Sequence, residues 1–336
     1  MSEIRYDPIH DFRVIIAEER LARPDEYMAA GNVAQRSDRI VPPDDFPLLS
    51  GHSAALRSRL TKEEACPFCE GRETQTPSER DAVAQTDRQQ NSPGWQVRSV
   101  PNRYPSISPH GDQEVIIDTP RHLERFGDMT DDECRHLIRF WHRRLHHLRE
   151  ENRWQYAQLF KNQGSAAGAS MRHLHTQIFC LPYVPREVLT EAQGLAKHLE
   201  NTGTCYHCDT LADELRDRLR FLGETPHLAA FCPFASRFQG EIHILPKRHI
   251  PCFTQTTPEE LDDLSRFLPT IIRRLERILP TPAYNLVLRQ SPWPVSPHFH
   301  WRLEILPRLN GIAGFEWGTG DFINPCSPER FAAQMR

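Results

Sequence analysis

The chain has 336 residues, a length more typical of two domains than of one or three. Its 41 Lys and Arg against 45 Asp and Glu give a net charge of −4, which argues against a broad basic surface for nucleic acid. No apolar run approaches the ~18 residues of a membrane span, and the N-terminal segment lacks the basic residues followed by an apolar stretch that are typical of a signal peptide. We therefore expect a soluble, cytoplasmic protein with no nucleic-acid partner and no membrane partner.

The predicted elements begin with a short β-like run at 13–16, followed by a polar, proline-broken stretch over 30–60. Residues 71–94 hold almost no large apolar side chain, so we expect an exposed loop there. The chain contains two C-x-x-C pairs, Cys66 with Cys69 and Cys205 with Cys208. Nine cysteines are an odd number in a chain too long to need disulfide bonds for stability, which points to metal before disulfides.

An internal repeat organises the rest of the chain. Residues 114–122 and 241–249 each read as a strand that ends at a proline, one or two basic residues and a histidine. Seven residues later each copy has the composition of a helix N-terminus, and apolar residues then recur at helical spacing over 137–148 and 261–278. Each helix leads to a strand opened by a tyrosine and then to a His-x-His pair. The order of features therefore occurs twice, as expected of a tandem duplication.

The repeat predicts an α+β fold in which each unit is an antiparallel sheet crossed by one long helix. We expect an N-terminal catalytic domain over 1–190 and a degenerate C-terminal domain over 191–336. Whether the two sheets join into one larger surface stays open at this point.

The C-x-x-C pairs and the repeated histidines predict two zinc sites, because zinc prefers four thiolate and imidazole ligands in a tetrahedral array. The first predicted set is Cys66, Cys69, His122 and His173, and the second is Cys205, Cys208, His249 and His298. Two thiolates and two neutral imidazoles cancel the charge of the ion and leave no position for a reactive water, so both sites are predicted to be structural. A redox pair, or a packed turn without metal, is the alternative.

The segment His173-x-His175-x-Gln177 is predicted to be extended, which places these three side chains on one face. The small residues of 162–170 before it let backbone N–H groups approach an anion closely. An imidazole beside such a loop predicts attack of His175 on phosphorus, with a phosphoramidate intermediate. Gln177 can hydrogen-bond a phosphoryl oxygen but cannot usefully donate a proton, which favours phosphate leaving groups. Metal binding or packing by both histidines is the alternative.

These motifs resemble the galactose-1-phosphate uridylyltransferase and ADP-glucose phosphorylase family of the histidine-triad superfamily. The resemblance covers nearly the whole chain and rests on the segments 66–69, 101–105, 170–177 and 314–325. It implies two histidine-triad-like units and a ping-pong mechanism. In that mechanism His175 takes a nucleotidyl group from a nucleoside-diphosphate sugar and passes it to hexose 1-phosphate or phosphate.

The resemblance also implies roles for individual residues and a homodimer with sites near the subunit interface. His175 and Gln177 would be catalytic, and the implied substrate-binding residues are Arg20, Arg23, Asn102, Asn162, Gly168, Ser170 and Glu316. Asn310 stands where the uridylyltransferases lead us to expect a lysine, so hexose 1-phosphate and inorganic phosphate both stay open as acceptors. In the second unit we expect His300 at the nucleophile position and Arg302 in place of the glutamine.

The leading prediction is a nucleotidyltransferase, a UDP-glucose:hexose-1-phosphate uridylyltransferase of galactose or related carbohydrate metabolism. The alternatives are an ADP-glucose phosphorylase and a dinucleoside polyphosphate phosphorylase or hydrolase, although Gln177 argues against efficient hydrolysis. A zinc-ribbon-like nucleic-acid-binding module is the alternative outside enzymes. The acidic net charge and the lack of a Lys/Arg stripe count against it.

Overall fold

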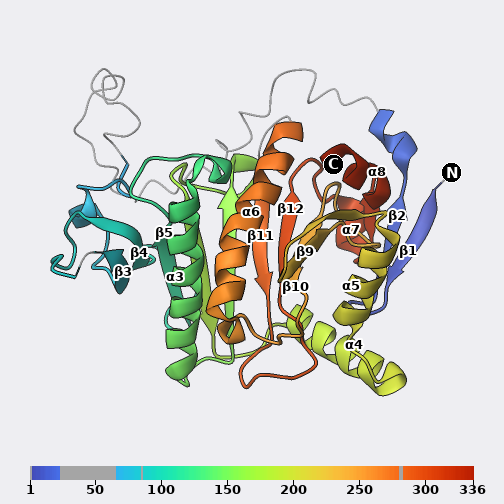
Figure 1. The fold of residues 1–336 in the computed structure, drawn as a ribbon, viewed down its shortest axis with the longest axis horizontal. Helices are drawn as coiled ribbons and strands as arrows, with labels where there is room; N and C mark the ends of the chain where they lie inside the picture. Colours follow the sequence, from blue (N-terminus) through green and yellow to red (C-terminus); the bar gives the residue numbers. More distant parts are fainter. Residues whose placement is uncertain (1, 23–65, 85, 280–282) are drawn as a thin grey trace.

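The computed structural model of the chain describes residues 2–22, 66–84, 86–279 and 283–336, and one antiparallel sheet of ten strands runs through it (Figure 1). Across the sheet the order is β3-β4-β5-β7-β6-β11-β12-β10-β9-β8. In chain order these strands are β3 (Asp81–Ala84), β4 (Trp95–Pro101), β5 (Asp112–Ile117), β6 (Tyr156–Gln163), β7 (His175–Leu181), β8 (Phe221–Glu224), β9 (Leu228–Phe231), β10 (Ile242–Pro246), β11 (Tyr284–Arg289) and β12 (Arg302–Pro307). Helices pack on the sheet, so the predicted α+β class is confirmed.

The ten-stranded sheet consists of two matching halves. From one edge the order is β3-β4-β5-β7-β6, and from the other edge the corresponding strands follow in the order β8-β9-β10-β12-β11. β6 and β11 stand together in the middle, paired from Gln163 opposite Tyr284 to Phe160 opposite Val287. The two copies predicted from the repeat are therefore present, and their sheets are continuous. The domain boundary near residue 190 stays a prediction.

Two long helices, α3 (Asp131–Glu150) and α6 (Pro258–Ile278), lie side by side across one face of the sheet (Figure 1). Each begins at a capping box formed by a threonine and the glutamate three residues later, which satisfies backbone N–H groups at the helix start. Their apolar stripes, which include Trp141 and Leu268, are buried in the main core between helices and sheet. A helix long and apolar enough to cross a membrane is not found among the residues described above.

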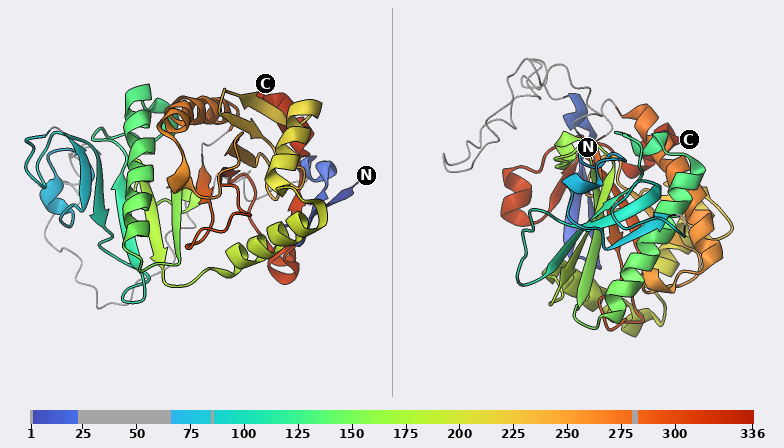
Figure 2. Two further views of the ribbon diagram at one scale, coloured as in Figure 1. Left: turned by 60° about the horizontal axis from the view of Figure 1, so that its bottom comes forward. Right: turned by 90° about the vertical axis from the view of Figure 1, so that its left-hand side faces the viewer.

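The opposite face of the sheet carries the strand residues that the sequence predicts to be catalytic. Side chains alternate along a strand, so Ile178 of β7 lies in the main core with α3 and α6, whereas His175 and Gln177 point to the other face. Helix α4 (Arg186–Thr202) covers part of that second face, where its Leu195 packs in a separate apolar cluster (Figure 2).

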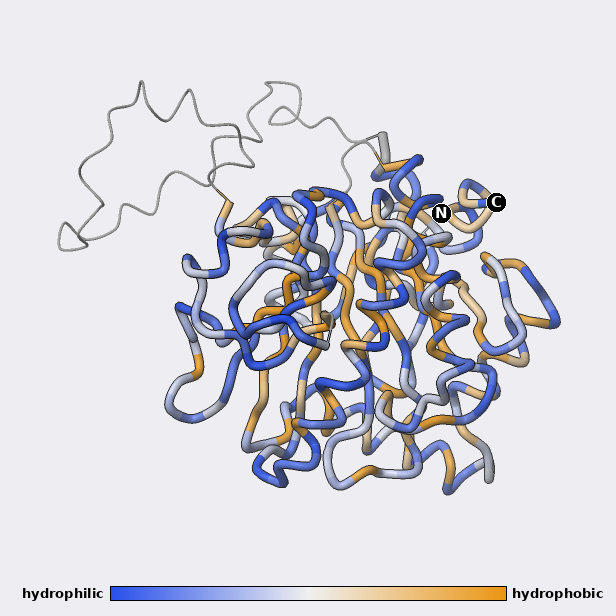
Figure 3. The backbone as a smooth tube through the Cα atoms, turned by 60° about the vertical axis from the view of Figure 1, so that its left-hand side comes forward, coloured by the Kyte–Doolittle hydropathy of each residue, from blue (hydrophilic) through white to orange (hydrophobic). Residues whose placement is uncertain are grey.

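A second, three-stranded sheet brings the two ends of the chain together in the order β1-β2-β13. The remaining elements are β1 (Glu3–Asp7), β2 (Phe12–Ile16), α5 (Tyr206–Asp217), α7 (Gly314–Thr319), β13 (Phe322–Asn324) and α8 (Pro328–Met335). β2 contains the β-like run predicted at 13–16, which confirms that element. Hydrophobic segments gather toward the centre of the molecule, and hydrophilic segments lie mostly at its periphery (Figure 3).

The prediction of an exposed loop over 71–94 is wrong in part. β3 forms inside this segment and pairs with β4. Glu79 is buried, and its carboxylate accepts hydrogen bonds from the guanidinium groups of Arg88 and Arg98, which balance its charge. The polar composition of the segment therefore reflects internal ion pairs as well as solvent exposure. The polar stretch over 30–60 lies outside the described residues.

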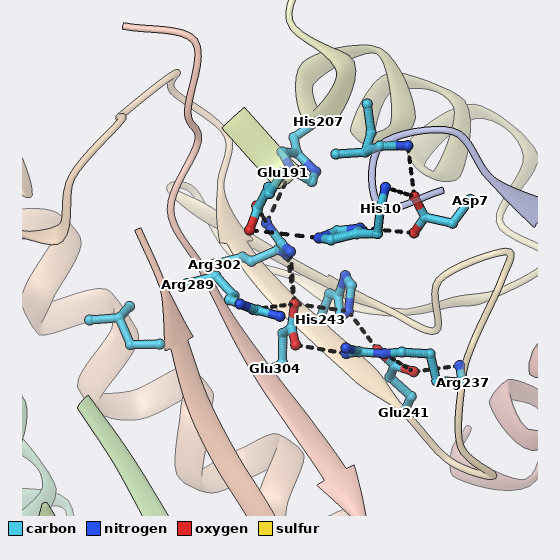
Figure 4. Close-up of polar contacts among 12 residues, drawn as sticks. Asp7, His10, Glu191, His207, Arg237, Glu241, His243, Arg289, Arg302 and Glu304 are labelled. Atoms are coloured by element: carbon cyan, nitrogen blue, oxygen red, sulfur yellow. Dashed lines mark hydrogen bonds and ion pairs between the residues drawn. The ribbon is translucent and has the colours of Figure 1, made fainter. Parts of the chain in front are cut away.

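A buried network of charged side chains ties the N-terminal hairpin to the second half (Figure 4). His10 Nδ1 lies 3.2 Å from Asp7 Oδ2, and His10 Nε2 lies 3.6 Å from Glu191 Oε2. Burial lowers the pKa of His10, but the two carboxylates outweigh it and raise the pKa to about 9. Glu191 in turn accepts a hydrogen bond from the Arg302 guanidinium.

We expect the protein to lose stability as the pH rises from about 6.5 to about 9, because His10 then loses its charge. The folded-state pKa of His10 lies above its ordinary value of 6.5, so its contribution is fully present below pH 6.5 and is lost as the pH passes about 9. The loss is roughly 1–3 kcal/mol. Urea unfolding of wild-type protein and His10→Gln at about pH 6 and about pH 9.5 measures it. An equal free-energy difference between the two proteins at both pH values would contradict this role.

Candidate active site

A cavity of about 820 Å³ opens on the second face of the sheet, beside the start of β7. Four of the predicted site residues line it, namely Asn102, Ser170, His175 and Gln177. The apolar and aromatic part of the lining includes Phe68, Val100, Tyr104 and Val115. A few polar groups in a largely apolar wall are typical of a small-molecule site.

His175 is held in one tautomer by its neighbour in the chain. Its side chain is 6% exposed, and its Nδ1 lies 2.9 Å from the carbonyl oxygen of His173. A carbonyl oxygen can only accept, so Nδ1 carries the proton and Nε2 keeps its lone pair. Burial, with a smaller contribution from the charge of Lys161, lowers the pKa of His175 and favours the neutral imidazole. His173 itself lies in a bend before the strand, so only His175 and Gln177 share a strand face.

A buried ion pair lies directly behind His175. Lys161 Nζ donates to Asp118 Oδ2 at 2.7 Å and to the carbonyl oxygen of His175 at 3.1 Å. The hydroxyl of Thr176 donates to the other Asp118 oxygen at 2.9 Å. Both charged side chains are fully buried, so removing either would leave an unpaired charge inside the protein. No motif in the sequence marks this pair, which fixes the backbone at His175.

The glycine-rich loop before β7 uses backbone conformations that favour glycine. Gly164 and Gly168 have φ angles of 79° and 84°. Asn285 Nδ2, from β11 in the second half, donates to Asn162 Oδ1 and to the carbonyl oxygen of Ala167, each at 2.8 Å. Asn285 therefore anchors both Asn162 and the loop to the second half. No repeat or motif in the sequence marked Asn285.

Of the predicted substrate residues that the structure describes, Arg20, Asn162, Gly168 and Glu316 are not among those that line this cavity within one chain. Arg20 is exposed on the short helical turn after β2, and Arg23 lies outside the described residues. Glu316 lies on α7, where its Oε2 accepts from the backbone N–H of Ala313 at 2.9 Å. It borders a different, small pocket together with Asn310.

The first predicted metal group assembles next to the cavity. Its four ligand atoms, from Cys66, Cys69, His122 and His173, lie within 4.8 Å of one another. His173 Nδ1 lies 3.6 Å from each sulfur, and His122 Nδ1 lies 3.3 Å from Cys69 Sγ. Zinc bonds of about 2.3 Å to sulfur and about 2.0 Å to nitrogen set these atoms about 3.5 Å apart in a tetrahedron. The group therefore fits a metal ion of this kind.

The backbone prepares His173 for such a role. Its Nε2 lies 2.8 Å from the carbonyl oxygen of Thr119, so Nε2 carries the proton and Nδ1 presents its lone pair to the sulfur atoms. The same arrangement recurs in the second half, where His300 Nε2 lies 2.9 Å from the carbonyl oxygen of Pro246.

The second metal group assembles with one correction. The four residues whose ligand atoms lie within 4.8 Å of one another are Cys205, Cys208, His249 and His300, so His300 takes the place predicted for His298. Cys208 Sγ lies 3.6 Å from Nδ1 of both His249 and His300. The prediction matched the two His-x-His motifs by their first histidines. The chain separation gives the right match, because His173 follows His122 by 51 positions and His300 follows His249 by 51 positions.

This correction changes which residues of the second unit correspond to His175 and Gln177. With His300 as a metal ligand, Arg302 stands at the position of His175 and Glu304 at that of Gln177. The prediction of His300 at the nucleophile position and Arg302 in place of the glutamine is therefore wrong. Arg302 and Glu304 are buried and paired with each other, and Arg302 also pairs with Glu191 (Figure 4). Charged pairs thus occupy the place where the first unit has His175 and Gln177.

A third cluster, of Glu241, His243 and Glu304, also brings its ligand atoms within 4.8 Å. Arg237 donates to both carboxylates, at 2.6 and 2.7 Å, and Arg302 donates to Glu304 at 3.0 Å. These guanidinium groups already balance the carboxylate charge, so the cluster does not call for a metal ion.

Comparisons with known proteins agree with this geometry. Residues 2–185 match the family model described as galactose-1-phosphate uridyl transferase, N-terminal domain, and residues 117–336 match a domain of unknown function, DUF4921. An ADP-glucose phosphorylase of Arabidopsis thaliana is 30% identical over 99% of this chain and 92% of its own. A crystal structure of an ADP-glucose phosphorylase from that plant with bound ADP-glucose matches with a TM-score of 0.81 and 30% identity, over 100% of this chain and 99% of that one. A galactose-1-phosphate uridylyltransferase of Thermotoga maritima is 28% identical over 87% of this chain and 95% of its own.

Proposed function

This chain belongs to the galactose-1-phosphate uridyl transferase family, and we propose that it carries a nucleotidyl group on His175 between a nucleoside-diphosphate sugar and a phosphate acceptor. The relatives of this chain are nucleotidyltransferases, and we assign it to the same class. The roles of the individual residues are what we propose. The observation that carries it is the tautomer of His175, whose Nδ1–H is held by His173 while Nε2 keeps its lone pair on a side chain that lines the cavity.

In the first proposed step Nε2 of His175 attacks the α-phosphorus of the donor. The N–P bond forms as the P–O bond to the sugar phosphate breaks, so hexose 1-phosphate leaves as an anion that needs no proton. Gln177 offers N–H groups to a phosphoryl oxygen, and Asn102 and Ser170 line the same cavity. In the second step an oxygen of the acceptor phosphate attacks the same phosphorus and releases His175 in its starting state.

Among donor and acceptor pairs we favour ADP-hexose with inorganic phosphate. A relative that is 30% identical over 99% of the chain is an ADP-glucose phosphorylase, which supports this choice. Asn310 supports it too, because an amide lacks the positive charge with which a lysine would attract the phosphate of a second sugar. UDP-hexose with hexose 1-phosphate is the second candidate, favoured by the similarity to uridylyltransferases over 87% of the chain.

We propose that both Cys/His groups bind structural zinc. Four protein ligands would leave no open position for a substrate, so the ion would supply rigidity rather than a reactive water. In the first group, Cys66, Cys69, His122 and His173 would hold it and so fix the bend whose carbonyl oxygen orients His175.

We also propose a homodimer in which Glu316 of one subunit contacts the sugar in the cavity of the other. The position of Glu316 at a separate pocket of its own chain supports this, as do its neighbours Trp317 and Phe315, which are 78% and 40% exposed. Such exposed aromatic side chains are common at subunit contacts. Light scattering of the purified protein measures the oligomeric state directly.

Nucleotide sugars labelled at the α-phosphate test the proposed function. Protein mixed with labelled ADP-glucose or UDP-glucose in the absence of acceptor should carry one acid-labile nucleotidyl group per chain. A dinucleoside polyphosphate serves as the third donor. The donor that labels at the lowest concentration identifies the nucleotide, and discharge by phosphate or by hexose 1-phosphate identifies the acceptor. Failure of every donor to leave an acid-labile label would reject the nucleotidyl-histidine route.

A further inference from the structure

We infer that Gln113 is a positioning residue that turns the Gln177 amide so that its N–H groups face the substrate phosphate. This inference rests on the proposed function of His175 and Gln177. Gln113 is 5% exposed on β5, the strand next to β7 in the sheet. Val115 of β5 stands opposite Gln177, so Gln113 lies two residues further along on the same face.

The direction of the Gln113 amide is fixed by the backbone. The N–H of Ser106 donates to Gln113 Oε1 at 3.0 Å, and a backbone N–H can only donate. Gln113 Nε2 is therefore the end that meets Gln177, and it donates to Gln177 Oε1 at 3.3 Å. The Ser106 N–H thus fixes which end of each amide is nitrogen and which is oxygen, because the two side chains meet donor to acceptor.

The orientation of Gln177 follows from this contact. Its Oε1 is engaged by Gln113, and its Nε2 has no hydrogen-bond partner among the described residues, while the side chain lines the cavity. A phosphoryl oxygen accepts hydrogen bonds, so Nε2 attracts it and Oε1 would repel it. Turning the amide over would exchange attraction for repulsion at the oxygen where charge develops during transfer.

Gln113 also holds the opposite wall of the cavity. Its backbone carbonyl oxygen accepts from the N–H of Asn102 at 2.8 Å, and its side chain holds Ser106. The segment between these two residues contributes Arg103 and Tyr104 to the cavity lining. Gln113 therefore joins the strand that carries the catalytic pair to the loop that faces it.

The second unit shows the same pair of positions without amides. Glu304 stands opposite His243, and Glu241 lies two residues further along, the relation that Gln177 has to Gln113. Arg237 bridges these two carboxylates with hydrogen bonds of 2.6 and 2.7 Å. The two positions are thus linked in both units. They hold amides, Gln113 and Gln177, only in the unit that carries His175.

Gln113→Glu tests the inference. The new carboxylate still accepts from Ser106 but cannot donate to Gln177 Oε1, so the Gln177 amide turns to offer its N–H groups to that carboxylate. We expect the single-turnover rate of nucleotidyl-His175 formation to fall about 10²-fold, with the apparent KM for the donor changed less than about 3-fold. Gln113→Met, which has no donor and no acceptor, should cost less than Gln113→Glu, because it leaves the Gln177 amide undirected rather than reversed.

A double-mutant cycle separates positioning from a general structural effect. If Gln113 acts through Gln177, adding Gln113→Glu to Gln177→Leu should slow label formation no further. Rate losses that multiply in the double variant would overturn the inference, as would a wild-type rate in Gln113→Glu while wild-type protein forms the adduct. Absence of the adduct in wild-type protein would instead overturn the proposed function, and with it the role of Gln113. If Gln113→Glu unfolds, judged by its thermal melting, the same cycle with Gln113→Met decides.

Discussion

Changing His175 to alanine should give a folded protein that carries no nucleotidyl group and turns over at least about 10³-fold more slowly than wild type. Within the described part of the chain, the His175 side chain hydrogen-bonds only to the carbonyl oxygen of His173, and Lys161 of the ion pair behind it holds the backbone oxygen of His175, which alanine keeps. The change therefore removes the nucleophile and little of the support. Label retained on protein and kcat measured with saturating donor report the effect, and circular dichroism reports folding.

His142→Ala is the matched control for this experiment. His142 is another partly buried histidine, and its Nε2 contacts the carbonyl oxygen of Thr254 on the helix side of the sheet. Its loss should affect stability and leave one label per chain. A label that survives in His175→Ala would assign the nucleophile to another residue.

Replacing Cys66 with serine should have the largest effect on stability. It should remove one of about two zinc ions per chain and lower the free energy of unfolding by at least about 3 kcal/mol, because the binding energy of a structural zinc contributes to folding. Activity should fall as well, since His173 would no longer be tied to two sulfur atoms and its carbonyl oxygen orients His175. Elemental analysis with urea unfolding of both proteins measures these changes. Full zinc content in Cys66→Ser would exclude Cys66 as a ligand.

Two neighbouring histidines provide the control in the second group. His300→Ala should lower the zinc content from about two to about one per chain, whereas His298→Ala should retain both ions. His300 Nδ1 lies 3.6 Å from Cys208 Sγ, and His300 belongs to the group of four converging ligand atoms. The opposite pattern would restore His298 as the ligand.

The repeat predicts most of the fold because two independent signals recur in it, the spacing of apolar residues and the order of the motifs. Helical spacing marks α3 and α6, and the strand, histidine and His-x-His order marks the strands around them. Motif order alone does not fix the alignment of the two units, because each His-x-His pair offers two histidines, and matching the first of each pair predicts His298 where the structure has His300. Equal separation of the ligands along the chain would have found the correct histidine, since ligands must return to the same point in each unit.

Other parts of the site follow from contacts that leave no periodic signal. The two units differ in length between a core residue of the strand and the residue whose carbonyl oxygen holds a histidine. In the first unit two residues lie between Ile116 and Thr119, whose carbonyl oxygen holds His173. Only one residue lies between Ile244 and Pro246 in the second unit. The first unit therefore has one residue more here, and the extra length accommodates Asp118, the partner of Lys161. Only the resemblance pointed to Glu316, because within one chain it borders a pocket separate from the cavity of His175.

The junction between β6 and β11 has a further consequence, which concerns symmetry. The same shift along the chain that carries His173 onto His300 carries Phe160 onto Val287, and these two residues stand opposite each other in the antiparallel pair. Each half thus meets the other through equivalent residues related by a twofold axis, which is the isologous geometry of a dimer of identical subunits. A protein consisting of one such unit would be able to build the same ten-stranded sheet by pairing with its own copy. In this chain the two halves are joined covalently, so the second half can carry the Arg302–Glu304 pair at the positions of His175 and Gln177 while its strands still complete the sheet of the first half.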